Sequence, residues 1–161
     1  MILIDWRDDF CTGIIGVDYE HEKMIEQING LFVSIDNKVD KRLLIESLGD
    51  IYGSISAHFA LEEQMMLKHK YDHYEEHRAD HQRLLNDIGD ITESLENSDE
   101  LDETIFKQKL ADWFQLHFKT HDSRLHKMVH QSPHDRADEP TLIKMVKDAK
   151  NKLLSKIRHP L

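Results

Sequence analysis

The amino-acid sequence predicts an all-α protein: an up-down-up-down four-helix bundle with an irregular N-terminal arm and an extra C-terminal helix. Helix breakers are scarce, because 6 glycines and 3 prolines among 161 residues are about half the share of average proteins. All three prolines follow residue 132, so no proline interrupts the rest of the chain. Apolar residues recur there with the 3.6-residue period of an α-helix, without useful strand-like alternation.

Two regions are expected. Residues 1–130 form the four-helix bundle, which begins with an irregular arm over residues 1–17, where Gly13 and Gly16 stand among short apolar runs. Residues 131–161 form a polar linker followed by a basic amphipathic helix. The division rests on the prolines and on a change in the balance of charge.

The first two bundle helices are predicted over residues 18–37 and 40–68. Asp18 is expected to cap the first helix and Asp40 to open the second, because a short acidic side chain accepts hydrogen bonds from the free amides of a first helical turn. Each helix carries one apolar stripe. The stripes are Ile25, Ile28, Phe32 and Ile35 in the first helix, and Leu44, Leu48, Ile51, Ile55, Phe59 and Met66 in the second.

The third helix is expected to open with Asp72 and Glu75, which have capping-box spacing, and to end before Asn97. The fourth follows the acidic loop of residues 97–102. Its buried side consists of Ile105, Leu110, Trp113, Phe114, Leu125 and Val129. Short connections make consecutive long helices antiparallel neighbours, which predicts the up-down-up-down topology.

The C-terminal helix, residues 141–158, has one apolar stripe and is otherwise covered with lysine and arginine. Three roles stay open for it. It could dock on its own bundle, bind a protein partner or a second copy of the chain, or lie on an anionic membrane surface. The membrane role ranks last, because the stripe lacks the Trp and Phe that are common in membrane-surface helices.

Composition excludes several functional classes. Residues 1–129 carry 14 Lys and Arg against 27 Asp and Glu, so we expect no nucleic-acid partner for the bundle. The single cysteine, Cys11, excludes a disulfide framework and a cysteine-based zinc or iron–sulfur site within one chain. The first residues have no basic segment followed by an apolar run of the right length, so we expect no secretion signal, and the uncharged runs are too short for a transmembrane segment. We therefore expect a cytoplasmic protein.

The 12 histidines are the most unusual feature. Residues four apart in a helix point in nearly the same direction, so such a pair can aim two ligand atoms at one ion. This spacing occurs in His58-x-x-x-Glu62, His77-x-x-x-His81 and His117-x-x-x-His121. Spacing alone leaves alternatives open, because histidines also recur every four residues from position 69 to position 81. For any single histidine, a position on a solvent-exposed helix face is the ordinary explanation.

Four motifs in order resemble those of the bacterial hemerythrins, single-domain non-haem di-iron proteins that bind dioxygen reversibly. Asp18 and His21 match the first motif, the segment 58–66 the second, the segment 71–81 the third and the segment 113–122 the fourth. The resemblance covers about residues 1–130.

The resemblance implies a cofactor of two iron ions joined by an oxo or hydroxo bridge and by the carboxylates of Glu62 and Asp122. One iron would be held by His21 and His58, and the other by the three histidines of the remaining motifs. The implied ligands are His21, His58, Glu62, His77, His81, His117 and Asp122. Regular helix geometry would instead have favoured His121 over Asp122, since residues 117 and 122 lie about 140° apart around an α-helix. No role is implied for His69, His73 or His121, and His126 is assigned only to the end of the fourth helix.

The implied function is reversible binding of dioxygen for storage, delivery or buffering, without catalysis. No Glu in the chain is followed three residues later by His, which disfavours the ferritin-like oxidases. The alternative is an oxygen or redox sensor that signals to a partner through the C-terminal helix. A third possibility, reduction of peroxide or nitric oxide, lacks a dedicated proton donor. The positions of apolar residues around the predicted helices indicate which side chains would line an oxygen pocket. These are Ile25, Phe59, Met66, Trp113 and Phe114.

Overall fold

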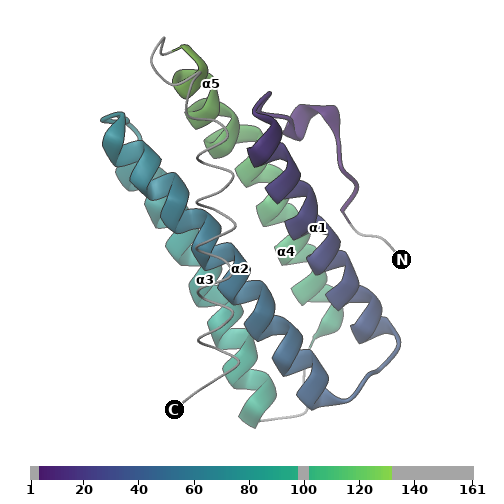
Figure 1. The fold of residues 1–161 in the computed structure, drawn as a ribbon. Coiled ribbons are helices and arrows are strands. Elements are labelled where there is room, and N and C mark those ends of the chain that lie inside the picture. Colours follow the sequence, from purple (N-terminus) through teal and green to yellow (C-terminus); the bar gives the residue numbers. More distant parts are fainter. Residues whose placement is uncertain (1–3, 98–101, 132–161) are drawn as a thin grey trace.

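The computed structural model describes residues 4–97 and 102–131, and Figure 1 shows a bundle of long helices that run alternately up and down. The described residues contain no strand. An N-terminal arm includes the short 3-10 helix η1 (Asp8–Phe10). The helices are α1 (Ile15–Asp36), α2 (Lys41–Lys68), α3 (Tyr74–Asn97) and α4 (Glu103–His117), and α4 continues through the π-helical segment η2 (Phe118–Asp122) into α5 (Ser123–Gln131). The predicted fold class is confirmed for the bundle, whereas the predicted helix of residues 141–158 lies outside the described residues.

The beginning of α1 differs from the sequence prediction. Asp18 was expected as the N-cap, but the helix begins three residues earlier, at Ile15. One carboxylate oxygen of Asp18 accepts hydrogen bonds from the amide and the hydroxyl of Thr12, both at 2.7 Å. The other accepts from the amide of Gly13 at 3.2 Å. Asp18 therefore connects the arm to the first turn of α1 and does not act as the N-cap of the helix.

Of the other predicted helix starts, Asp40 agrees with the structure, whereas α3 begins at Tyr74, one residue later than an N-cap at Asp72 would place it. Asp40 is the N-cap of α2, and its carboxylate accepts from the amide of Arg42 at 2.8 Å. Asp102 caps α4 in the same way, accepting from the amide of Ile105 at 3.0 Å. These bonds satisfy amides that have no partner inside the helix.

A lysine in the left-handed conformation ends α1. Lys38 has a φ of 51°, and its amide donates to the carbonyl of Ile35 at 2.9 Å. The next amide, of Val39, donates to the carbonyl of Ser34 at 3.2 Å. This pair of bonds is the Schellman motif, which usually places glycine where Lys38 stands.

The same motif ends α2. Lys70 also has a φ of 51°, and its amide donates to the carbonyl of Leu67 at 3.2 Å. The amide of Tyr71 donates to the carbonyl of Met66 at 2.9 Å, and both side chains are buried in one apolar cluster. An apolar contact between these two positions commonly accompanies the motif, and it fixes the direction in which the chain leaves α2.

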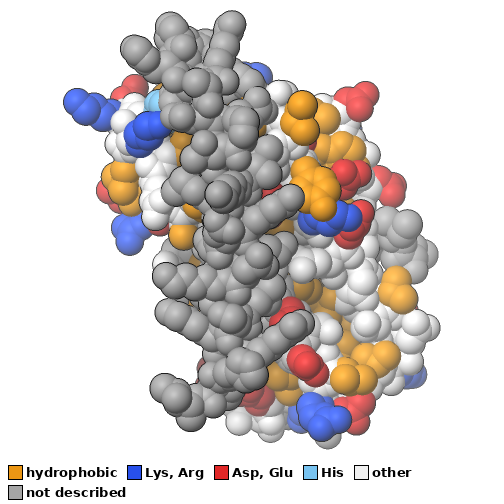
Figure 2. All heavy atoms as spheres, viewed as in Figure 1, with side chains coloured by type: hydrophobic (Ala, Val, Ile, Leu, Met, Phe, Trp, Pro, Cys, Tyr) orange, Lys and Arg blue, Asp and Glu red, His pale blue; other side chains and the backbone are white. Residues whose placement is uncertain are grey.

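The visible outer surface mixes acidic, basic and apolar side chains, as Figure 2 shows. Among the described residues, the most exposed large apolar side chains are Ile15 at 78% and Leu116 at 65%. No described helix combines the length and the apolar character that crossing a membrane requires.

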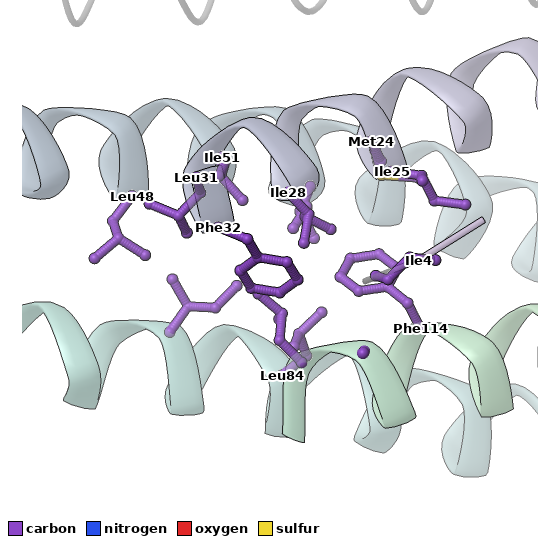
Figure 3. Packing of buried hydrophobic residues seen from close by; sticks show 14 of the residues in the cluster. Ile4, Met24, Ile25, Ile28, Leu31, Phe32, Leu48, Ile51, Leu84 and Phe114 are labelled. Atoms are coloured by element: carbon purple, nitrogen blue, oxygen red, sulfur yellow. The ribbon is translucent and has the colours of Figure 1, made fainter. Parts of the chain in front are cut away.

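Two apolar clusters fill the interior. In Figure 3, side chains of α1 and α2, among them Phe32, face Leu84 and Phe114 of the opposite helices. We call the larger cluster the main core; it consists of Ile4, Phe10, Met24, Ile25, Ile28, Leu31, Phe32, Ile35, Leu48, Ile51, Ile55, Phe59, Leu84, Ile88, Leu95, Phe106, Leu110, Ala111, Phe114 and Phe118. We call the smaller cluster the end core; it consists of Met65, Met66, Tyr71, Leu125 and Val129.

Replacing Lys38 by glycine is expected to stabilise the protein. Glycine adopts a positive φ without the steric cost of about 1 kcal/mol that a Cβ brings. Lys38→Gly should therefore raise the free energy of unfolding by about 0.5 kcal/mol, after the loss of chain entropy is subtracted. Glu46→Gly, at an exposed position inside α2, is the matched control and should lower it by about 1 kcal/mol. Urea unfolding of the three metal-free proteins measures the difference, and equal losses in both variants would contradict the strain at Lys38.

Candidate metal centre

Seven acidic and histidine side chains lie together inside the bundle, and they are the seven predicted ligands. None is more than 6% exposed, although histidine, aspartate and glutamate usually keep contact with water. Every helix of the bundle contributes. The residues are His21 of α1, His58 and Glu62 of α2, His77 and His81 of α3, His117 of α4 and Asp122 of η2.

A change of helix type places Asp122 in this cluster. The fourth helix is α-helical to His117 and π-helical from Phe118 to Asp122. A π-helix pairs each residue with the fifth one along, so the wider turn brings Asp122 beneath His117. The Nε2 atom of His117 lies 2.9 Å from Oδ1 of Asp122. The five-residue spacing that regular geometry disfavours is thus accommodated by one π-helical turn.

Asp122 faces two groups of imidazoles with its two oxygens. Its Oδ2 atom lies 3.2 Å from Nε2 of His21. Its Oδ1 atom lies 3.1 Å from Nε2 of His77, on the side where His117 also stands. One carboxylate therefore spans the distance between the two groups.

Glu62 has the same arrangement from the opposite helix. Its Oε1 atom lies 3.6 Å from Nε2 of His58. Its Oε2 atom lies 3.6 Å from Nε2 of His77 and 3.2 Å from Nε2 of His81. Both carboxylates thus belong to two sets of possible ligand atoms, one with His21 and His58 and one with the other three histidines.

The donor atoms fit bound cations. For metal–ligand bonds of about 2.1 Å, two ligands at right angles lie about 3 Å apart. The Nε2 atoms of His21 and His58 are separated by 3.1 Å, and those of His77 and His117 by 3.3 Å. Nε2 of His81 is buried and, although it lies 3.2 Å from Oε2 of Glu62, makes no conventional hydrogen bond among the described residues. Few buried polar atoms lack such a bond. A cation would satisfy this nitrogen atom.

Burial sets the charge state of one histidine group. It lowers the pKa of His21 to about 3 and also lowers the pKa of His58, because a charged imidazole is costly away from water. Burial alone would raise the pKa of Glu62 and of Asp122, but the surrounding imidazoles lower both below their usual range. Neutral imidazoles and ionised carboxylates are the forms that bind metal.

His117 has the opposite tendency. Burial opposes its charge, but the carboxylates of Asp122 and Asp80 outweigh that effect and raise the pKa of His117 to about 9. Without a metal, His117 therefore carries a proton at neutral pH and offsets part of the negative charge. A cation that binds Nε2 displaces the proton held there.

Two acidic residues that the sequence analysis missed orient the imidazoles from outside. Nδ1 of His117 lies 2.8 Å from Oδ2 of Asp80, and Nδ1 of His81 lies 3.2 Å from Oε1 of Glu63. A carboxylate that accepts from the outer nitrogen leaves the inner nitrogen free for a metal. Asp80 could have been found, because it follows His77 by three residues and so shares its helix face.

His126 was also missed. Its side chain is fully buried, and its Nε2 atom lies 3.0 Å from Oε1 of Glu62. The histidines without an implied role lie further out: His73 is exposed and pairs with Glu76 at 3.3 Å, His69 is partly exposed, and His121 is only partly buried.

Aromatic rings cover one side of the cluster. Phe59 stacks on His81 with ring centroids 3.7 Å apart, and Trp113 stacks on His117 at 4.3 Å. The two aromatic rings lie 5.8 Å from one another. Two of the five residues predicted to line a pocket therefore contact predicted ligands directly.

The other three predicted pocket residues divide between the two cores. Ile25 and Phe114 belong to the main core, and the ring of Phe114 contacts that of Trp113 at 4.9 Å. Met66 belongs to the end core. That these five residues line one pocket stays a prediction.

Comparison with known proteins gives a family match over most of the chain. The model of the hemerythrin HHE cation binding domain matches residues 12–129. No solved structure matches the fold significantly.

Curated relatives are similar over part of their length. A bacteriohemerythrin of Stenotrophomonas maltophilia is 29% identical over 82 residues, which are 51% of this chain and 53% of the relative. A bacteriohemerythrin of Pseudomonas aeruginosa is 30% identical over 77 residues, 48% of this chain and 50% of the relative. Hemerythrin subunit alpha of Lingula anatina is 33% identical over 81 residues, 50% of this chain and 62% of the relative. The chain thus spans about half the length of the curated relatives it matches.

Moving the carboxylate from position 122 to position 121 is not expected to preserve metal binding. Asp122→Asn should weaken cobalt(II) binding at least about tenfold, and adding His121→Asp should not restore it, because the π-helical turn directs position 122 inward. Titration followed by cobalt absorption measures the affinities, with His121→Asn as the control that keeps them. Recovery in the double variant would show that an ordinary α-helix can supply the ligand.

Acidification should destabilise the metal-free protein below pH 6.5. The pKa of His21 is about 3 in the folded protein, where burial opposes its charge, and about 6.5 in the unfolded chain. Between these values the unfolded state binds a proton that the folded state does not. Stability should fall from pH 6.5 to about 5.5, a window that lies above most of the titration of unfolded carboxyl groups. Urea unfolding at several pH values measures the slope. His21→Gln should make it shallower, and an unchanged slope would contradict this assignment.

Proposed function

The chain belongs to the hemerythrin family, and on that premise we propose that it binds dioxygen reversibly at a non-haem centre of two iron ions. The observation that carries the proposal is the orientation of Glu62 and Asp122. Each carboxylate directs one oxygen to the group of two imidazoles and its other oxygen to the group of three. A carboxylate that spans two ions holds them a few ångströms apart. Storage, delivery or buffering of oxygen in the cytoplasm would follow from reversible binding.

The two groups of ligands are unequal, which supports binding of a small molecule at one side. His21 and His58, with one oxygen from each carboxylate, supply four donor atoms. The other side has His77, His81 and His117 and therefore five donors. An oxygen atom shared between the ions would add one donor to each side. An iron that takes six ligands would then be complete beside the three histidines and would have one open position beside His21 and His58.

The donor chemistry favours iron and a binding function. Imidazole suits iron, and the ferritin-like oxidases use more carboxylates than the two found here. When bound, the iron pair supplies the electrons that dioxygen takes up. The protein's own contribution is to hold the donors in place and to keep water away, since Phe59 and Trp113 lie against two of the imidazoles. We therefore propose binding without turnover.

The alternative role, oxygen or redox sensing through residues 141–158, stays a prediction because those residues lie outside the described part of the chain. Deleting residues 134–161 distinguishes the two roles. A sensor would lose its cellular response and keep oxygen binding, whereas a carrier would keep both.

The proposal predicts a reversible change of colour. Protein loaded with ferrous iron under argon should hold about two ions per chain, gain an oxo-bridged di-iron absorption band in oxygen and lose it under vacuum. Asp122→Asn, the matched variant at one bridging carboxylate, should hold less iron and show no reversible band. Two irons that oxidise without recovery would contradict the carrier function.

A further inference from the structure

His126 is a buried imidazole to which neither the sequence motifs nor the proposed ligand set gives a role. It lies on α5 with its side chain 0% exposed, and its neighbours Leu125 and Val129 belong to the end core. Burying an imidazole is costly unless it makes a hydrogen bond. The bond that His126 makes therefore identifies its function.

That bond is directed to a single carboxylate. Nε2 of His126 lies 3.0 Å from Oε1 of Glu62, and Nδ1 of His126 has no hydrogen-bond partner among the described residues. An ionised carboxylate only accepts hydrogen bonds, so Nε2 must carry the proton and donate it. The five histidines at the ligand positions need the opposite state, because the nitrogen that binds a metal cannot hold a proton.

The helix geometry brings His126 there as a consequence of the π-helical turn. Asp122 ends η2, and His126 follows it by four residues in the regular helix α5. Residues four apart share one face of an α-helix. Once the π-helical turn directs Asp122 into the bundle, the next turn directs His126 toward Glu62 as well.

The bond constrains the less crowded side of the centre. Oε1 of Glu62 faces His58, whereas Oε2 faces His77 and His81. On this side of the centre only the oxygen of Glu62 has a hydrogen-bond donor among the described residues. The corresponding oxygen of the other carboxylate, Oδ2 of Asp122, makes no conventional hydrogen bond there. Without a donor at Oε1, Glu62 could rotate and bind with both oxygens on the side of three histidines.

We propose that His126 is a positioning residue, which donates Nε2–H to Oε1 of Glu62 and holds that carboxylate across the two metal positions. The inference rests on the proposed two-metal centre. His126 does not bind metal itself. It fixes the bridging orientation of Glu62 and so maintains the affinity of the position held by His21 and His58.

Cobalt(II) titration of the full chain tests the proposal. In His126→Leu the first ion should bind as in the unchanged protein, and the second should bind about ten- to a hundredfold more weakly. His126→Gln keeps an N–H donor and should stay within about threefold of the unchanged protein. His73→Gln, which removes an exposed imidazole, is the control and should change neither affinity.

Two results would overturn the proposal. One is normal binding of both ions by a folded His126→Leu variant, and the other is equal weakening in His126→Leu and His126→Gln. Failure of the unchanged protein to bind two ions would instead overturn the proposed centre on which the inference rests.

A measurement on the unchanged protein does not depend on how the variants fold. In the diamagnetic zinc(II)-loaded chain, nitrogen–proton NMR correlations of the histidine rings should show His126 as the Nε2–H tautomer, with a slowly exchanging proton. An unprotonated or metal-bound Nε2 atom would overturn the proposal.

Discussion

The interaction on which the site depends is the contact of two buried carboxylates with two sets of imidazoles. Glu62 and Asp122 are both ionised in the interior, and each raises the energy of the other's charge. Two negative charges away from water are costly, and the neighbouring imidazoles offset that cost, since the pKa of both carboxyl groups lies below its usual range. Cations between the two sets would neutralise the carboxylates, so metal binding and stability of the fold should be linked.

The rest of the bundle holds these groups at fixed positions. Four helices supply the ligands, and the main core and the end core contain the apolar side chains around them. The outer nitrogens of His81 and His117 face Glu63 and Asp80, which fixes the direction of both rings. The Schellman motif after α2 sets where α3 begins, and therefore where His77 and His81 enter the interior.

The sequence predicted the helices well because periodic apolar stripes are local signals, although Ile105 of the predicted buried side is 53% exposed. The N-cap of α2 at Asp40 was correct, whereas Asp18 was misassigned because an acidic residue near a helix start can bond backward to the arm as readily as cap the helix. Helical spacing could not select Asp122 over His121, since the π-helical turn is not visible in a pattern that assumes 3.6 residues per turn. Only the family resemblance selected it. His126 was missed for a related reason: its partner, Glu62, is on another helix, and no local pattern reports such a contact.

The central claim is that Glu62 and Asp122 join two metal positions in one buried site. A crystal structure of the iron-loaded chain, with anomalous scattering recorded at the iron edge, tests it most directly. The account predicts two peaks about 3.5–4 Å apart, one beside His21 and His58 and the other beside His77, His81 and His117, with both carboxylates between them. A single peak, or two peaks that share neither carboxylate, would contradict it.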